Sequence, residues 1–461
     1  MNAATIARKL QIVQRTLLVG LVLAFAAPAA VACPFCEAVS ATWRQEIEAV
    51  DAVVIAEAPR SPERDEATGE VEFKIVQRLK GGDFTRQPTV TAVYFGDLRP
   101  LGRYLLSGVD AGGLQWSCMP LSEESEAFLL QILEFGDDEL ERIRFVQQYL
   151  EHSDSMLRRE AYNEFAITPY PVIQQLRDDM DREQLVRWIQ DPELPPDRRR
   201  LYLTMLGVCG SEAEVPMLEA MLTDPQRESR SGLDALIACY LLLGGEEKLE
   251  LINERFLGNS EASYTDTYAA IMALRFHGTE ADKIPRSALV ESLHLVLDRK
   301  ELADLVIPDL ARWNDWSQID RLVGLFVEAD EDNRFIRVPV VNYLRACPKP
   351  EAAEALEKLK EIDPDSVRRA GALIPVPVPK KSSQPETSLH IPSRGEQLAM
   401  AASRWSVDFP AWANAGRGIT TERPNRVRLS SVATMAVATL VISFYLVLSG
   451  GSRCRRQPTA A

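Results

Sequence analysis

Apolar residues recur as pairs of helical faces along the middle of the chain, and this repeat constrains the fold more than any other feature. In one pair, Gly244 and Gly245 separate the two helical segments. The first face of that pair carries Leu233, Leu236, Ile237, Tyr240 and Leu241. Comparable first helices are expected to begin near Asp197, Gln226, Asp266, Lys300 and Asn333. A spacing of roughly 30 to 40 residues is typical of a solenoid of stacked helix pairs.

The sequence therefore predicts an α-helical repeat array over residues 121–365. The array resembles HEAT-type repeats, because short helices alternate and Arg or Asp residues stand near helix starts and turns. Another α-solenoid would show the same pattern, and an irregular helical bundle is the alternative. The open face of such an array usually binds a protein or peptide. We therefore expect an exported or cell-surface protein or peptide as the partner.

Residues 33–120 are predicted to be rich in β-strands. Strands are expected over 51–57, 71–75, 90–95 and 103–107, with a fifth after Gly112-Gly113, and a short helix over 38–50 precedes them. Short strands at this density are typical of a small β-barrel or sandwich. The Cys33-Pro-Phe-Cys36 pair, the helix, the first strand and the strand and turn over 73–82 resemble the netrin-like module, an OB-type barrel found in tissue metalloproteinase inhibitors. That family uses a closer Cys pair.

Two apolar segments bracket the chain. Residues 1–32 have the parts of a secretory signal peptide, because basic residues precede a short apolar run and Ala30-Val31-Ala32 suits cleavage before Cys33. An uncleaved anchor and a lipoprotein acylated on Cys33 are the alternatives. Residues 429–449 carry no charge and approach the roughly 20 residues that a transmembrane helix needs. Residues 366–428 are predicted to be a Pro-rich flexible tether, and residues 450–461 a short basic cytoplasmic tail.

These segments predict a single-pass protein of a bacterial cell membrane, with the bulk of the chain on the periplasmic side and the C-terminus in the cytoplasm. The chain has no Asn-x-Ser/Thr glycosylation site, which favours a bacterial origin. The expected fold class is α+β and multidomain. It comprises a small N-terminal β-barrel, an α-solenoid of HEAT-like helix pairs and a single C-terminal transmembrane helix.

Cys33-Pro-Phe-Cys36 is the sharpest chemical motif. Glu37 stands where a c-type haem site needs His, and no second CxxC completes a zinc site. The favoured interpretation is a disulfide from Cys33 or Cys36 to Cys118, which would stabilise the fold by about 2–4 kcal/mol. A redox-active Cys33–Cys36 dithiol and a metal site are the alternatives. Cys209 and Cys239 are expected to be buried free thiols.

Catalytic chemistry finds little support in the sequence. The formal net charge of −15 argues against nucleic-acid binding, which needs a basic face. The four histidines share no metal-ligating spacing; they are His152, His277, His294 and His390. No common hydrolase or phosphate-binding motif occurs in the sequence. His277 is expected to cap the end of a helix. We expect no catalytic residue, no cofactor and no metal.

The expected function is therefore non-enzymatic: a membrane-anchored binding or scaffold protein that presents a helical-repeat surface outside the cell membrane. One alternative is an exported thiol-redox protein that uses Cys33 and Cys36. The other is a protease-inhibitor-like module. The resemblance to metalloproteinase inhibitors implies that a free amine and carbonyl on Cys33 would chelate the zinc of an enzyme. The sequence does not indicate the oligomeric state.

Overall fold

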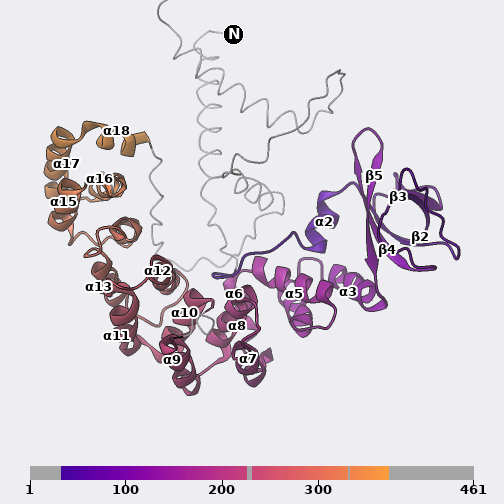
Figure 1. The fold of residues 1–461 in the computed structure, drawn as a ribbon, viewed down its shortest axis with the longest axis horizontal. Coiled ribbons are helices and arrows are strands. Elements are labelled where there is room, and N and C mark those ends of the chain that lie inside the picture. The colour runs from indigo at the N-terminus through magenta and orange to yellow at the C-terminus, as the bar shows by residue number, and fades with distance from the viewer. Residues whose placement is uncertain (1–32, 226–230, 331–332, 373–461) are drawn as a thin grey trace, which may run out of the picture. The chain divides into compact units, whose positions relative to one another are not determined.

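Five short segments rich in β-branched and aromatic residues form one antiparallel sheet in the computed structural model (Figure 1). The sheet has the strand order β3-β2-β1-β4-β5. Its strands are β1 (Ala52–Glu57), β2 (Glu70–Lys80), β3 (Thr89–Val93), β4 (Arg103–Asp110) and β5 (Leu114–Leu121). The structure describes residues 33–225, 231–330 and 333–372, which lie in a unit of residues 1–384; the second unit, residues 385–461, lies outside the described part.

The sheet is a half-barrel, so the expectation of a closed small β-barrel is wrong. β3 and β5 stand at opposite ends of the strand order and share no ladder. β1 lies at the centre and is buried on both faces. Val54 and Ala56 join the core on the inner side of the half-barrel, whereas Val53 and Ile55 pack with the helices. The sheet is thus continuous with the hydrophobic core of the helical part.

A short helix, α2 (Trp43–Ala49), precedes the sheet. A capping box fixes its start, because the Thr42 hydroxyl accepts from the Gln45 amide while the Gln45 side chain accepts from the Thr42 amide. Trp43 packs edge-on against Phe128 of the first helix after the sheet, with ring centroids 5.7 Å apart. This contact joins the residues before the sheet to the residues that follow it.

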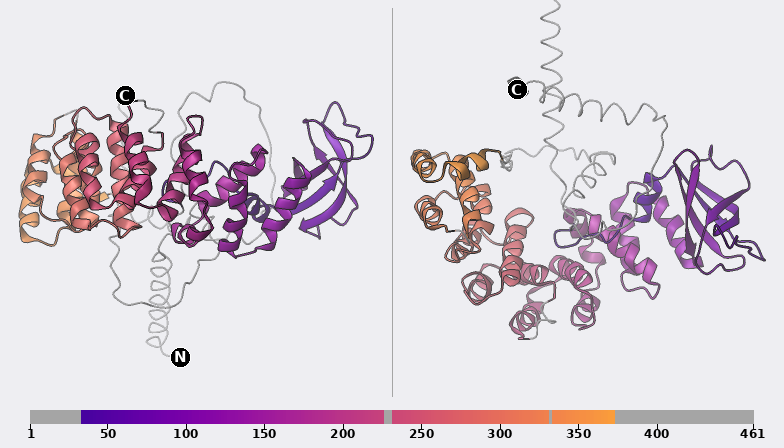
Figure 2. Two further views of the ribbon diagram at one scale, coloured as in Figure 1. Left: turned by 90° about the horizontal axis from the view of Figure 1, so that it is seen from below. Right: turned by 45° about the horizontal axis from the view of Figure 1, so that its top comes forward.

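The chain after the sheet is helical throughout its described part (Figure 2). Polar residues accept from first-turn amides at several helix starts, including Ser122, Asp154, Asp181 and Ser263. The α-helices are α3 (Glu123–Glu134), α4 (Glu139–Val146), α5 (Ser155–Ile167), α6 (Tyr170–Gln175), α7 (Arg182–Ile189), α8 (Pro196–Cys209), α9 (Val215–Thr223), α10 (Leu233–Gly244), α11 (Leu249–Ile252), α12 (Tyr264–Thr279), α13 (Arg286–Val296), α14 (Ile307–Arg312), α15 (Ile319–Glu328), α16 (Arg337–Ala346), α17 (Pro350–Ile362) and α18 (Pro364–Ala372).

These helices pack as two rows, which confirms the prediction of a helical-repeat fold. In the first row α10 packs against both α8 and α12, and α16 packs against both α14 and α18. In the second row α7, α9, α13 and α17 pack beneath α8, α10, α12 and α16, and α15 packs against α17. Because α18 reaches Ala372, the array extends past the expected boundary at residue 365.

Ion pairs repeat along the first row with the period of the repeat. Arg200 Nε of α8 lies 2.8 Å from Asp234 Oδ1 of α10, and Arg275 Nε of α12 lies 2.8 Å from Asp309 Oδ2 of α14. The partners are 34 residues apart in each pair. An arginine on one helix thus holds an aspartate on the next helix of the same row.

The expected membrane anchor needs correction. Among residues 33–225, 231–330 and 333–372, no helix combines the length and the apolar composition that a membrane crossing requires. The described part of the chain therefore contains no transmembrane helix of the kind that the expected single-pass fold and location require. The proposed span at 429–449, the signal peptide at 1–32, the tail at 450–461 and residues 373–428 of the proposed tether lie outside the described residues.

Candidate functional site

The first eleven described residues form an extended segment that lies across the helical repeats. This N-terminal segment, residues 33–43, runs from its disulfide at one end to the start of α2 at the other (Figure 1). Between Cys33 and Thr42 it contains turns and bends but no helix or strand. Its main chain therefore needs hydrogen-bond partners from elsewhere in the fold.

The disulfide joins Cys33 to Cys36, which corrects the prediction of a bridge to Cys118. The Cys36 amide donates to the Cys33 carbonyl at 3.2 Å, so the four residues close a tight turn. Cys33 is 3% exposed and packs in the helical core. Cys118 is a free thiol on β5, opposite Leu106 of β4, and packs against the core of the half-barrel.

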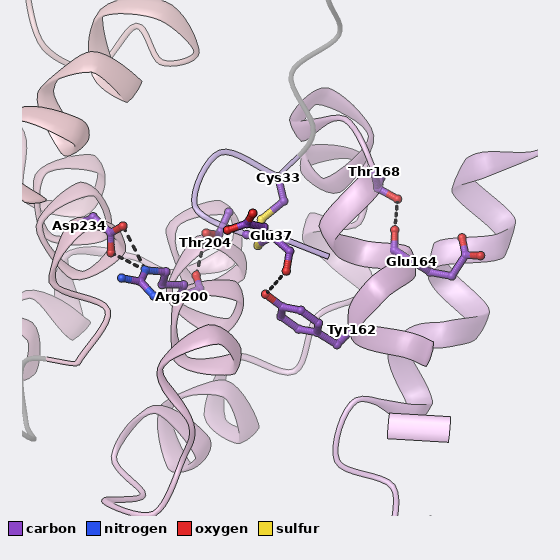
Figure 3. Close-up of a disulfide and its surroundings, with 9 residues drawn as sticks. Cys33, Glu37, Tyr162, Glu164, Thr168, Arg200, Thr204 and Asp234 are labelled. Atoms are coloured by element: carbon purple, nitrogen blue, oxygen red, sulfur yellow. Dashed lines mark hydrogen bonds and ion pairs between the residues drawn. A yellow bond between two sulfur atoms is a disulfide. The ribbon is translucent and has the colours of Figure 1, made fainter. Parts of the chain in front are cut away.

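Side chains of α5 bind the backbone of the N-terminal segment. Tyr162 Oη donates to the Glu37 carbonyl at 3.1 Å, as Figure 3 shows. Asn163 uses both ends of its amide: its Oδ1 accepts from the Val39 amide at 2.9 Å, and its Nδ2 donates to Ser40 Oγ at 3.0 Å. Asn163 itself is fully buried. This pattern resembles the way a protein holds a bound peptide, since two of the three contacts go to the main chain.

A buried carboxyl fixes the far end of the segment. The Trp43 amide donates to Glu160 Oε1 at 2.7 Å. Burial raises the pKa of the Glu160 carboxyl to about 8, and the hydrogen bond from Trp43 opposes this shift. Beside it, Glu164 Oε2 lies 3.0 Å from Arg142 Nε and 4.0 Å from Arg44 Nη1. These paired charges join α2, α4 and α5 beneath the segment.

An aromatic cluster holds the disulfide turn. Phe35, between the two cysteines, lies with its ring centroid 5.2 Å from that of Phe276 on α12. Tyr170 at the start of α6 meets Phe276 edge-on at 5.2 Å. Aromatic pairs at such distances are stabilised by burial and by the tilt of their rings. The turn thus packs on α12 beside an aromatic contact that joins α12 to α6, which lie about a hundred residues apart in the sequence.

The surroundings of the disulfide are polar but internally paired. In Figure 3, Thr204 and the Arg200–Asp234 pair lie to the left of Glu37. Arg200 Nε reaches both carboxylate oxygens of Asp234, at 2.8 and 3.0 Å, and Thr204 Oγ1 donates to the Arg200 carbonyl. These side chains are therefore positioned by α8 and α10 themselves, and they shape a surface rather than supply an acid or a base.

The free thiols of Cys118, Cys209 and Cys239 are not set up as nucleophiles. Burial raises the pKa of Cys118 to about 12 and that of Cys209 to about 11, and it raises the pKa of Cys239 further. The thiolate is the reactive form, so these groups stay inert near neutral pH. The expectation of a buried free thiol holds for Cys239, whereas Cys209 is partly exposed.

The histidines serve different parts of the helical array. His277 lies inside α12 and its Nε2 bonds the Ala238 carbonyl of α10 at 3.1 Å, so the expected helix-capping role is wrong. Burial lowers its pKa to about 4. His294 Nε2 lies 2.7 Å from Asp315, and His152 Nε2 lies 3.7 Å from Glu124. His390 lies outside the described residues. In the part of the chain that the structure describes, no three His, Cys, Asp or Glu residues form a metal-binding group.

Sequence reasoning identified the two cysteines but missed the residues that receive them. Glu160, Tyr162, Asn163 and Phe276 come from helices that follow the cysteines by more than a hundred residues. The burial of polar side chains distinguishes these residues, but only the structure shows it. The α5 sequence places Glu160, Asn163 and Glu164 at fully or nearly fully buried positions, where a helix of a repeat array normally carries apolar side chains.

Comparison with known proteins identifies no family. No protein-family model matches the chain, and no curated protein matches it. A solved structure of human deoxyhypusine hydroxylase in complex with glycerol matches with 16% sequence identity and a TM-score of 0.21, covering 54% of this chain and 95% of that one. A likeness of this size carries no argument about this protein. The resemblances to HEAT repeats and to the netrin-like module stay predictions.

Proposed function

We propose that this protein is a non-catalytic binding protein whose helical repeats hold an extended peptide. One observation carries the proposal: α5 and α12 already bind residues 33–43 of the same chain as such a peptide. Solenoids of helix pairs commonly bind partners on an open face. The expected membrane location is not part of the proposal.

The contacts define what the surface recognises. Phe276, which packs against Tyr170, receives the aromatic ring of Phe35, and Asn163 receives the main-chain amide of the residue four positions further along the segment. Tyr162 contacts the carbonyl between them. Two of these three contacts are hydrogen bonds to the main chain of the bound segment. The surface therefore tolerates varied side chains on a peptide but requires an extended backbone and one aromatic residue.

The alternatives expected from the sequence gain no support from these contacts. A thiol-redox enzyme presents its disulfide to a substrate, whereas Cys33 is buried against helices. An inhibitor that chelates zinc through Cys33 needs a free carbonyl, whereas this carbonyl accepts from the Cys36 amide and the residue is enclosed. Both activities would require the segment to leave the surface first.

A direct binding experiment tests the proposal. In the variant Phe35→Ala/Val39→Pro the segment loses its aromatic anchor and the amide that donates to Asn163, while the helices stay unchanged. A fluorescent peptide of residues 33–43 should bind this variant, with a rise in anisotropy in the micromolar to millimolar range. Adding Phe276→Ala should abolish that binding. A double variant that stays folded by circular dichroism and binds no peptide would refute the proposal.

A further inference from the structure

We propose that the Cys33–Cys36 disulfide is a catch that keeps the peptide-binding surface occupied by the chain's own segment, and that its reduction opens this surface to a second extended peptide with an aromatic residue. The inference rests on the proposed function and adds to it the class of partner and the condition under which it binds.

Phe35 is the residue through which the disulfide affects docking of the segment. Phe35 lies between the two cysteines, inside a turn that the Cys36 amide and the disulfide both close. The turn presents the ring to Phe276 in one conformation. Closing a four-residue loop restricts the free segment enough to favour docking by about 20-fold over the open dithiol form. Reduction removes this advantage, so the contacts of the segment with Phe276 and with α5 open more readily.

The two sulfur atoms differ in access, which sets the course of the reaction. Cys33 is buried, whereas Cys36 is half-buried. A dithiol reductant therefore attacks Cys36 Sγ as the thiolate, and Cys33 leaves as a thiolate that takes up a proton. The second thiol of the reductant then displaces Cys36. The reductant becomes a disulfide, two electrons pass to the protein, and both cysteines end as thiols.

The far end of the segment stays attached after reduction. Trp43 remains bonded to Glu160 and packed on Phe128, and the capping box of α2 lies next to it. The freed residues are therefore those from Cys33 to about Thr42, which cover Tyr162, Asn163 and Phe276. A competing peptide gains these contacts without unfolding the junction with the half-barrel.

The test uses the full chain and a labelled peptide of residues 34–43 in which Cys36 is replaced by Ser. We expect this peptide to bind the chain treated with dithiothreitol at least about 10-fold more tightly than the oxidised chain. The variant Cys33→Ser/Cys36→Ser should bind like the reduced chain and should not respond to dithiothreitol. It serves as the control for effects of the reductant on other thiols.

The outcomes separate the two proposals. Equal affinity for the oxidised and reduced chains, together with binding to Phe35→Ala/Val39→Pro, would contradict control by the disulfide but would support the peptide-binding function. No binding to any of these folded forms overturns both. If Cys33→Ser/Cys36→Ser does not fold, the comparison of oxidised and reduced parent chain decides alone, and a ratio below about 3-fold contradicts the proposal.

Discussion

At the scale of single residues, Glu160 ties the docking of the N-terminal segment to pH. Burial raises the pKa of its carboxyl from 4.5 to about 8, so folding takes up a proton there between these two pH values. The stability that this group contributes is complete below pH 4.5 and is lost as the pH rises through about 8.

Glu160→Gln should therefore reduce the pH dependence of the free energy of unfolding. Glutamine keeps an oxygen that accepts from the Trp43 amide but carries no charge to desolvate. Since one pKa unit corresponds to about 1.4 kcal/mol, we expect the free energy of unfolding in mildly alkaline buffer to rise by 1 kcal/mol or more. Urea unfolding followed by tryptophan fluorescence at acidic and alkaline pH measures this. The exposed Glu301→Gln is the matched control, and a loss of alkaline stability in Glu160→Gln would contradict the account.

Two helix glycines form a second matched pair. A Cβ on Gly278 in α12 would lie 2.2 Å from the Trp313 ring, whereas a Cβ on Gly324 in α15 would meet nothing within 4 Å. We expect Gly278→Ala to destabilise the fold by about 1–3 kcal/mol, because it overpacks this contact. Gly324→Ala should stabilise it by about 0.5–1 kcal/mol, because alanine favours the helix. Thermal or urea unfolding of both variants checks this, and effects of the same sign would count against the packing described.

At the scale of elements, the Arg–Asp pairs along the first row differ in burial. The Asp309 side chain is fully buried and contacts both Arg275 and Arg312, whereas the Asp234 side chain is 18% exposed beside Arg200. Removing one partner of a buried pair typically costs about 3–5 kcal/mol, and an exposed pair contributes about 0–1 kcal/mol. Asp309→Asn should therefore destabilise the array more than Asp234→Asn. Urea unfolding that ranks them in the reverse order would show that the row does not depend on these pairs.

The elements themselves were largely predictable. Strands expected over 51–57, 71–75, 90–95 and 103–107 match β1 to β4 apart from the lengths of their ends, because the alternation of buried and exposed residues follows the pleat. Helices expected near Asp197 and Asp266 match α8 and α12. The half-barrel was not predictable, since the strand order and the absence of a ladder between β3 and β5 depend on pairing that no single strand sequence records.

The prediction of the disulfide pairing was wrong for a related reason. Cys118 faces the half-barrel core, whereas Cys33 and Cys36 lie on the helices. A CxxC turn can close on itself, and only the placement of the N-terminal segment decides between the two pairings. That placement depends on Tyr162, Asn163 and Phe276, which are distant in the sequence, so local patterns could not reveal the candidate site.

At the scale of the whole described part, one face of the sheet packs in the hydrophobic core of the helical array, whereas the inner face of the half-barrel has a core of its own. The N-terminal segment crosses the array before it reaches the sheet. A segment bound mainly through its backbone can leave while the core stays intact, because local openings need less free energy than global unfolding. Under the proposed function, residues 33–43 are a bound peptide that belongs to the same chain.

Hydrogen exchange of the oxidised full chain tests this claim most directly. The amides of Val39 and Trp43 donate to Asn163 and Glu160, so we predict that they exchange at least about 10-fold more slowly than in the free peptide of residues 33–43. We also predict that the Val39 amide becomes exposed at denaturant concentrations where α8 and α10 remain protected. Exchange of both amides at the free-peptide rate in the native chain would show that the segment is not bound, and it would contradict the account.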